Sequence, residues 1–171
     1  FGLLVIICIL SLILIKSTLR NNVIVKTDIV KTYETYNDTI DLYNSININN
    51  TYSKGGTVII PSFAVERAQT IMYLLWQLKE EDRIPNIPYI IDTPMGISVL
   101  DVFENNKKWH KLSDEDCVAM CKMFFMNSDY QETINMIYDK QPKVVIAASG
   151  MITGGRVLSY LERYISLAET T

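Results

Sequence analysis

A glycine-rich turn near the end of the chain has the composition of an anion-binding site. It reads Ser149-Gly150-Met151-Ile152-Thr153-Gly154-Gly155-Arg156 and separates an apolar run from an amphipathic one. Glycines let a backbone approach a ligand closely, and the free N–H groups of a following helix favour a phosphate. Arg156 adds a charged donor. The turn matches neither the GxGxxG fingerprint nor a P-loop, so composition alone favours a purely structural strand-to-helix turn.

A second polar turn follows the run 57–60. That β-branched, apolar run is typical of a strand covered on both faces, and Pro61 is expected to end it, because proline donates no ladder hydrogen bond. Ser62 is then predicted to cap a helix, with Glu66 in the favourable first turn of that helix. The apolar residues of this helix recur at helical spacing and predict one buried face: Val65, Ala68, Ile71, Met72, Leu75 and Trp76.

A positive side chain in the first turn of a helix opposes the helix dipole. Arg67 occupies such a position in the predicted helix, so we expect it to have a negative partner. Glu66 or Asp92 would supply that partner from within the chain, and a phosphate would supply it from a ligand. The residues alone leave both interpretations open.

Three cysteines and one histidine are too few for a recognisable zinc site. Cys117 and Cys121 lie four residues apart on a predicted helix, where we expect ordinary core or surface thiols. His110 lies in a polar connection and is predicted to face solvent. We therefore expect no metal ligand in this chain.

Strand-like apolar runs alternate with amphipathic helical patterns along the chain. This alternation predicts βαβ units, and hence an α/β fold of three layers with a mostly parallel sheet flanked by helices. The predicted strands are 12–15, 57–60, 89–92 and 144–148, and the predicted helices are 28–46, 97–105, 114–125, 130–138 and one each after Ser62 and Gly155. Right-handed crossovers would bring the turns after the strands to one edge, where open α/β sheets bind ligands.

The first part of the chain is the hardest to classify. Residues 2–15 are almost wholly apolar, but they are fewer than the roughly 20 that a membrane span needs. We predict a strand at 12–15 and leave 1–11 unassigned, with a signal sequence or short anchor as the alternative. The stretch 44–52 is rich in Asn and Ser and is expected to be a loop. The chain begins at Phe1 rather than Met, which predicts a fragment or a processed product.

The composition is that of a folded domain of ordinary size, with 49% hydrophobic and 20% charged residues among 171. The net charge of −3 argues against binding of nucleic acid through overall charge and leaves a local basic patch open. The few, widely spaced cysteines provide no disulfide framework, which favours a reducing, cytoplasmic compartment. Membrane attachment through residues 1–15 is the minor alternative.

Three stretches together resemble the signature sequences of the β-CASP domain, the cap inserted into metallo-β-lactamase-fold nucleases of RNA and DNA processing. They are Gly55–Gln69, Tyr89–Met95 and Val145–Val157, in the order and spacing of that family. The resemblance extends from about Leu12 to the last residue, so we predict a β-CASP-like domain over 12–171. It implies a Rossmann-like cap that closes over a metal-dependent phosphodiesterase site.

In that family, two zinc ions activate water for the cleavage of RNA, and the cap grips the nucleic-acid backbone. The resemblance implies RNA, or another nucleic acid, and a metallo-β-lactamase domain of the same parent chain as partners, with a homodimer left open. The family's turns that face the cleft fall on Ser62, Arg67, Ser149, Gly150, Thr153, Gly154, Gly155 and Arg156. We interpret these residues as phosphate-binding, and zinc as a cofactor of the intact protein but not of this chain.

The chain also departs from the family pattern. The family's metal ligands come from a His-x-His-x-Asp-His motif and further residues, and His110 matches none of them. Where the family begins its cap with an acid, this chain has Lys16. Our main hypothesis is therefore the substrate-clamping part of an RNA phosphodiesterase, inactive by itself. The alternatives are a non-catalytic interaction module, with or without membrane attachment through residues 1–15, and a truncated, non-functional fragment.

Overall fold

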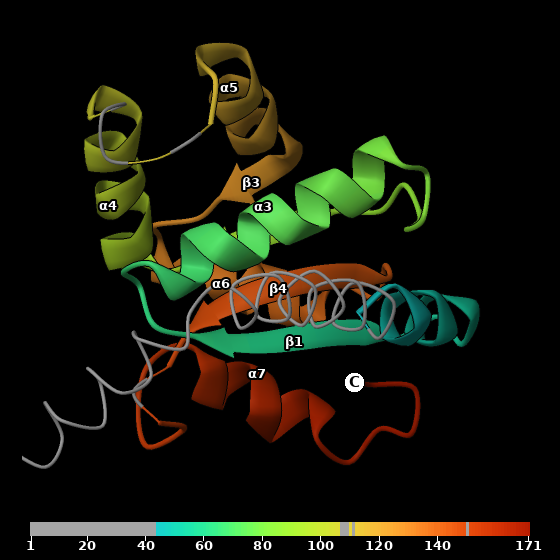
Figure 1. Cartoon of the computed structure of the whole chain (residues 1–171). Helices are drawn as coiled ribbons and strands as arrows, with labels where there is room; N and C mark the ends of the chain where they lie inside the picture. Colours follow the sequence, from blue (N-terminus) through green and yellow to red (C-terminus); the bar gives the residue numbers. More distant parts are fainter. Residues whose placement is uncertain (1–43, 107–109, 111, 150) are drawn as a thin grey trace, which may run out of the picture. The chain divides into compact units, whose positions relative to one another are not determined.

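The computed structural model describes residues 44–106, 110, 112–149 and 151–171. Residues Tyr43–Thr171 form one compact unit, and Figure 1 labels most of its helices and strands. The unassigned segment 1–11, the predicted strand 12–15 and all but the last residues of the predicted helix 28–46 lie outside the described residues. None of the described helices is both long and apolar enough to span a membrane.

Strands and helices alternate along the described chain, as the sequence predicts. The strands are β1 Thr57–Ser62, β2 Tyr89–Asp92, β3 Phe124–Met126 and β4 Lys143–Ala148. The helices are α3 Arg67–Glu80, α4 Pro94–Asn105, α5 Asp114–Met123, α6 Tyr130–Tyr138 and α7 Val157–Tyr164. A further helical stretch covers 44–53, ahead of β1.

The four described strands form one parallel sheet in the order β1-β4-β2-β3. Strand β4 is central, because Val145 pairs with Ile59 of β1 on one side and with Ile90 of β2 on the other. Val145 and its neighbour Ile146 are both 0% exposed, as expected for a strand covered on both faces. The predicted α/β fold with a parallel sheet is confirmed.

Helices cover both faces of this sheet (Figure 1). On one face α3, α4 and α5 pack against the strands, with Leu75 and Met120 in the same core cluster as Ile146. On the other face α6 and α7 contribute Ile137 and Tyr160 to the cluster that contains Val145. Successive strand residues point to opposite faces, so β4 serves both clusters and the domain has three layers.

The chain reverses its winding direction within the sheet. Strands β1, β2 and β3 follow one another through α3, α4 and α5 on one face, whereas α6 and α7 flank β4 on the other face. Doubly wound sheets of this kind bind ligands outside the carboxyl ends of the strands, at the point of reversal. Here the connections separate on both sides of β4, because α7 leaves β4 on one face while α3 and α4 leave β1 and β2 on the other.

The apolar face predicted for the helix after Ser62 is confirmed in part. Ala68, Met72 and Leu75 are buried in α3. Ile71 and Trp76 are half-buried against the same core. Val65 is 60% exposed, because α3 begins only at Arg67.

Strand β3 is missing from the sequence prediction. We expected a helix over 114–125, but α5 ends at Met123, and Phe124–Met126 pairs with β2. No glycine or proline marks this change in the sequence. Pairing with β2 overrides the local pattern, since the ring of Phe124 packs edge-on against Tyr89 with 6.1 Å between the centroids.

The segment ahead of β1 also differs from its prediction. We expected a loop over 44–52, and these residues are helical. Ile48 is 2% exposed within the core, so packing outweighs the low helix propensity of the neighbouring Asn and Ser residues. Gly55 terminates the helix in the left-handed conformation, with a φ of 73°, and its amide donates to the Tyr52 carbonyl.

Helix α4 starts earlier than predicted. We expected a turn at Thr93–Gly96 and a helix from residue 97, but α4 begins at Pro94. The Thr93 hydroxyl accepts a hydrogen bond from the Gly96 amide at 3.2 Å and caps the helix. Proline suits the first helical position, so Thr-Pro is a helix start here rather than a turn.

Strand β1 continues past the proline that was expected to end it. It includes Pro61 and Ser62, because β1 is an edge strand of the described sheet and an edge position needs no outward N–H. The outer edge of β1 is partly paired with Thr171. The Ile59 amide donates to the Thr171 carbonyl at 2.8 Å, and the Thr171 amide donates to the Thr57 carbonyl at 3.2 Å.

Candidate functional site

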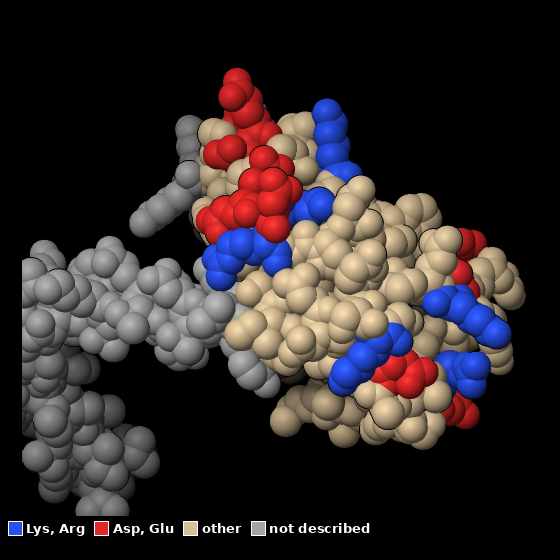
Figure 2. Space-filling view, turned by 90° about the vertical axis from the view of Figure 1, so that its right-hand side faces the viewer, with Lys and Arg blue, Asp and Glu red and all other residues tan. Residues whose placement is uncertain are grey.

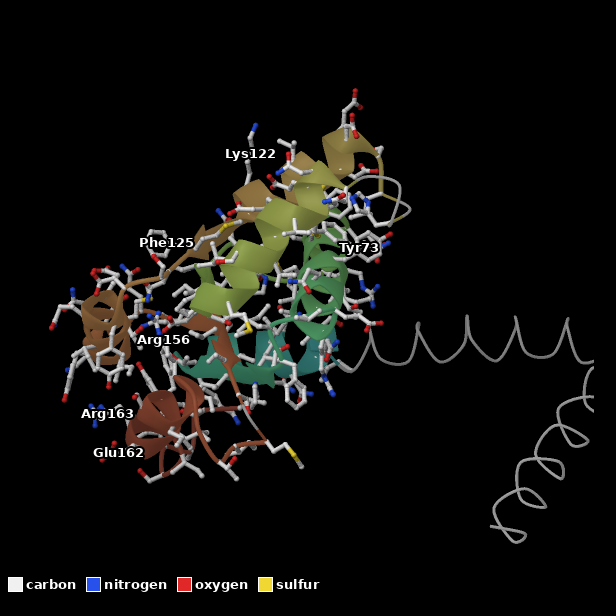
Figure 3. The ribbon with its side chains drawn as sticks, turned by 90° about the vertical axis from the view of Figure 1, so that its left-hand side faces the viewer. Tyr73, Lys122, Phe125, Arg156, Glu162 and Arg163 are labelled. Atoms are coloured by element: carbon white, nitrogen blue, oxygen red, sulfur yellow. The ribbon has the colours of Figure 1, made fainter. Side chains whose placement is uncertain are left out.

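The carboxyl ends of the parallel strands bring the sequence-predicted turns together. The register pairs Ser62 with Ala148 and Asp92 with Ala147, so β1, β4 and β2 end at one edge. The Ser149 amide donates to the Ser62 carbonyl at 3.0 Å and ties the turns after β1 and β4 to each other. Figure 3 views this edge of the sheet and labels Arg156, which follows the second turn.

These two turns leave the sheet toward opposite faces. After β1 the chain enters α3 on one face, and after β4 it enters α7 on the other. Neighbouring strands whose connections separate in this way have a crevice outside their carboxyl ends. The residues predicted from two distant stretches of sequence therefore lie along one edge.

The turn after β1 contains a strained residue. Helix α3 begins at Arg67 because Glu66 has a φ of 66° and a ψ of −56°. The Arg67 amide donates to the Val65 carbonyl at 2.8 Å and closes a γ-turn, which is unfavourable for a residue with a side chain. Glu66 is thus not in the first turn of the helix, and that prediction is wrong.

The prediction that Ser62 caps a helix is also wrong. Ser62 is still part of β1 and is 2% exposed. Its hydroxyl donates to the Phe63 carbonyl at 3.0 Å. The extra residues of the turn separate Ser62 from the first N–H groups of α3, so its hydroxyl cannot cap them.

Arg67 is exposed at the first position of α3. Neither acid suggested by the sequence neutralises it: among the described ion pairs, Asp92 is paired with Arg156, and Glu66 is in no ion pair. The Arg67 guanidinium has no hydrogen-bond partner within the described residues. Among the predicted side chains, it is the one available to an anion from outside.

The glycine-rich turn after β4 is held at both ends. The Ser149 hydroxyl accepts a hydrogen bond from the Ile152 amide at 3.0 Å. Gly155 has a φ of 85°, and a Cβ there would lie 2.3 Å from the Ala148 carbonyl oxygen, so a side chain does not fit. Between these ends Met151 and Ile152 both have positive φ and are 80% and 52% exposed. The turn therefore presents its tip outward.

Three further predicted residues belong to this turn. Thr153 is exposed and interacts with other residues of the chain. A Cβ added to Gly154 would meet nothing within 4 Å, so there is room for a side chain at this position. Gly150 lies outside the described residues. Phosphate binding by these residues stays a prediction.

Asp92 is wholly buried at the same edge, with 0% exposure. Its Oδ1 accepts hydrogen bonds from Asn127 Nδ2 at 3.0 Å and Thr133 Oγ1 at 3.1 Å, and it is paired with Arg156 Nη1. Its Oδ2 accepts from Tyr160 Oη at 2.7 Å. A single carboxylate thus connects β2 with the β3–α6 connection, α6 and α7 in one polar network.

Arg156 points inward from the start of α7 to this carboxylate. Its Nη1 also lies 3.3 Å from the Asn127 carbonyl oxygen, and its Nη2 donates to the Ser128 carbonyl at 2.5 Å. The side chain is 12% exposed. Most of its donors therefore have internal partners, unlike those of Arg67.

Tyr160, like Thr133, is a wholly buried donor to Asp92, at 0% exposure. Burial raises the pKa of the Tyr160 phenol, and the hydrogen bond to Asp92 acts in the same direction. The phenol is thus kept as a donor. Sequence analysis missed Tyr160, although its place four residues after Arg156 puts both on one side of α7. It also missed Asn127 and Thr133, since it did not find the strand that precedes them.

The two described cysteines and the histidine lie away from this edge. Cys117 and Cys121 are buried free thiols, and burial raises the pKa of Cys121. His110 is half-buried rather than solvent-facing, because its ring stacks on Phe103 with 4.0 Å between centroids. Among the described residues, no group of His, Cys, Asp or Glu could hold a metal ion. The zinc of the family therefore does not fit the described side chains.

An apolar groove of about 760 Å³ lies between α3 and α4, beside the turn after β1. It is lined by Val65, Glu66, Gln69, Thr70, Tyr73, Val99, Val102, Phe103, Asn106 and Leu112. These described lining residues include an acid but no lysine or arginine. The described lining thus offers no basic side chain to a phosphate backbone.

Figure 2 shows the opposite end of the domain, toward the amino ends of the strands. Basic and acidic side chains are interspersed on this face, and much of it is uncharged. A face of this kind offers no extended positive surface to nucleic acid. It leaves the carboxyl edge as the better candidate site.

The fold is a doubly wound α/β domain whose turns after β1, β4 and β2 gather at the carboxyl edge of a parallel sheet, the edge at which sheets of this class bind ligands. The Beta-Casp domain matches residues 68–171 of the sequence, and the chain belongs to the β-CASP family. The predicted resemblance is therefore confirmed.

The relatives include two ribonucleases and a transcription termination factor. Ribonuclease TTHA0252 of Thermus thermophilus is 32% identical over 137 residues, which cover 77% of this chain and 31% of that protein. Endoribonuclease YSH1 of Candida glabrata is 32% identical over 127 residues, or 68% and 16% of the two chains. Transcription termination factor FttA of Methanosarcina mazei is 26% identical over 123 residues, or 68% and 19%. The matched part is less than a third of each relative.

Proposed function

We propose that this chain is the substrate-clamping part of a metal-dependent RNA phosphodiesterase. Membership of the β-CASP family and the ribonuclease relatives support RNA as the substrate. The observation that carries the proposal is the edge at which the turns after β1 and β4 meet, with Arg67 exposed and without an ion-pair partner in the described structure. The crevice there would hold the RNA backbone.

The groups along this edge suit a phosphate rather than a base. A guanidinium can bind two phosphate oxygens at once, and Arg67 stands where the N–H groups of α3 also point outward. The turn adds the exposed residues Met151, Ile152 and Thr153 on the other side. Contacts of this kind fix the position of a nucleic acid without reading its sequence.

Cleavage would belong to a metallo-β-lactamase half of the parent protein, where bound zinc supplies an activated water and neutralises developing charge. We therefore expect the purified 171-residue chain to leave RNA intact when zinc is added. Cleavage that depends on zinc and is stopped by a chelator would show that the chain carries a catalytic site of its own.

The clamp is tested by binding of a short fluorescein-labelled single-stranded RNA, followed by anisotropy from about 50 to 200 mM KCl. Arg67→Gln should weaken binding several-fold and reduce the slope of log K against log salt by about 0.7, the value for one phosphate on a single strand. Arg83→Gln is the matched control, because Arg83 is already paired with Glu81 at 2.9 Å beyond the other end of α3.

Two results would contradict the proposal. One is equal binding by wild type and Arg67→Gln with the same salt dependence. The other is no binding of RNA by the wild-type chain at the lowest salt. The second result would favour the alternative of a non-catalytic interaction module.

A further inference from the structure

We infer that Asp92 and Arg156 are positioning residues: their ion pair fixes the Met151–Gly155 part of the glycine-rich turn, and Arg156 does not itself hold phosphate. This inference rests on the proposed function, in which that turn is one wall of the RNA-binding crevice. It assigns Asp92 a role that the sequence did not suggest, and it gives Arg156 a different role from Arg67.

The surroundings of Arg156 are those of a structural group. Its side chain is 12% exposed, and its donors go to the Asp92 carboxylate and to the carbonyls of Asn127 and Ser128. A guanidinium that binds several acceptors in one plane is held in a single orientation. Reaching outward to a phosphate would require Arg156 to leave Asp92 as an unpaired buried charge, which is strongly unfavourable.

Asp92 is a fixed anchor for that arginine. It has 0% exposure, and Asn127, Thr133 and Tyr160 each donate to it in addition to Arg156. The donors come from α6, α7 and the β3–α6 connection, so one helical layer and the end of the neighbouring strand set the position of the carboxylate. An arginine bound to such an anchor has little freedom to move.

The anchor acts on the turn through the chain itself. Arg156 directly follows Gly155, whose φ of 85° places the backbone against the Ala148 carbonyl. At the other end, the Ser149 amide is bonded to the Ser62 carbonyl. The exposed residues of the turn are thus fixed at one end to β1 and at the other end to the buried ion pair.

Positioning and direct contact predict opposite effects for one substitution. If Arg156 held phosphate, Asp92→Asn would remove its competing carboxylate and tighten RNA binding. If the pair positions the turn, Asp92→Asn and Arg156→Gln should each weaken binding, by about tenfold, and the double variant should lose little more. The salt slope should stay at the wild-type value, because no phosphate contact is removed.

The controls carry the same charge changes on α7, away from the network. Glu162→Gln matches Asp92→Asn, and Arg163→Gln matches Arg156→Gln; Figure 3 shows both control residues on α7. They correct the measured affinities for the change in net charge. Tighter binding by Asp92→Asn, or a lower salt slope for Arg156→Gln than for Arg163→Gln, would overturn the inference.

Amide hydrogen exchange provides a readout that needs no RNA. In Arg156→Gln the amides of Met151–Gly155 should exchange faster than in wild type, while those of β4 keep their protection. Unchanged exchange in the turn would overturn the inference even if the wild-type chain binds no RNA, a result that by itself would count only against the proposed function.

If Asp92→Asn does not fold, Arg156→Lys replaces it. Lysine keeps the charge but lacks the planar fork, so wild-type affinity in that variant would also refute positioning.

Discussion

Tyr160 Oη lies 2.7 Å from Asp92 Oδ2, and both residues are 0% exposed although 68 positions separate them. The hydrogen bond joins α7, in the helical layer on one face of the sheet, to the carboxyl end of β2. Its acceptor is a carboxylate, and hydrogen bonds to charged groups are stronger than those between neutral groups. Loss of this phenolic proton should therefore lower the stability of this edge.

Tyr160→Phe should lower the free energy of unfolding by about 1–3 kcal/mol, because it leaves a buried carboxylate oxygen without its donor. Urea unfolding followed by circular dichroism measures this change. Tyr164→Phe is the matched control: its hydroxyl donates at 2.8 Å to the Ile137 carbonyl, a neutral acceptor, on the same helix. A smaller loss of unfolding free energy for Tyr160→Phe than for Tyr164→Phe would show that another group compensates the Asp92 carboxylate for the missing donor.

The contrast between Asp92 and its partners explains which parts of the site could be predicted. Strand β2 and the turns after β1 and β4 have local signals, namely β-branched runs followed by proline or glycine. Asn127 and Thr133 have none, since each reaches Asp92 only after β3 pairs with β2. Side chains whose role depends on strand order cannot be found from local patterns in one sequence.

The glycine-rich turn offers a second prediction. Gly155→Ala should lower the free energy of unfolding by about 1–3 kcal/mol, because alanine is strained at a φ of 85° and its Cβ would meet the Ala148 carbonyl. Gly154→Ala should change stability by no more than about 0.5 kcal/mol, since nothing lies near its Cβ. Thermal unfolding of the two variants measures both changes in stability. Equal effects at both positions would mean that the turn rearranges freely.

The γ-turn before α3 stores strain that one substitution should release. Glu66→Gly should raise the free energy of unfolding by about 0.5–1 kcal/mol, because glycine adopts a φ of 66° without steric cost. Glu162→Gly, the same change inside α7, should instead lower it by about 1 kcal/mol. If both substitutions destabilise the chain, the claim that the backbone of Glu66 is strained is wrong. If the turn serves RNA binding, Glu66→Gly should also weaken that binding as it stabilises the chain.

The position of Glu66 shows why the start of α3 was misplaced. The serine at 62, the acid at 66 and the helical spacing that follows are each typical of a helix beginning at Ser62. The extra turn instead leaves Val65 exposed and Arg67 at the first helical position. Local propensity is overridden here at the candidate site, where strained backbone is most often found.

Lys143 provides a prediction for the amino ends of the strands. Its side chain is 1% exposed; Nζ donates to the Met136 carbonyl at 3.0 Å and lies 3.5 Å from Asp139 Oδ2. Burial lowers the pKa of this ammonium group, and Asp139 offsets only part of the effect. The unfolded chain therefore binds the proton more tightly than the folded chain does.

Stability contributed by Lys143 should consequently increase as the pH rises through its folded pKa toward the ordinary value of 10.5. The difference in the free energy of unfolding between wild type and Lys143→Met should shift in favour of wild type as the pH rises toward 10.5. Lys140→Met is the control: Lys140 is exposed, and its difference from wild type should not vary in this way. Urea titrations at several pH values measure both differences. If the difference for Lys143→Met stays constant or falls as the pH rises, the buried ammonium group keeps its proton as firmly as the unfolded chain does.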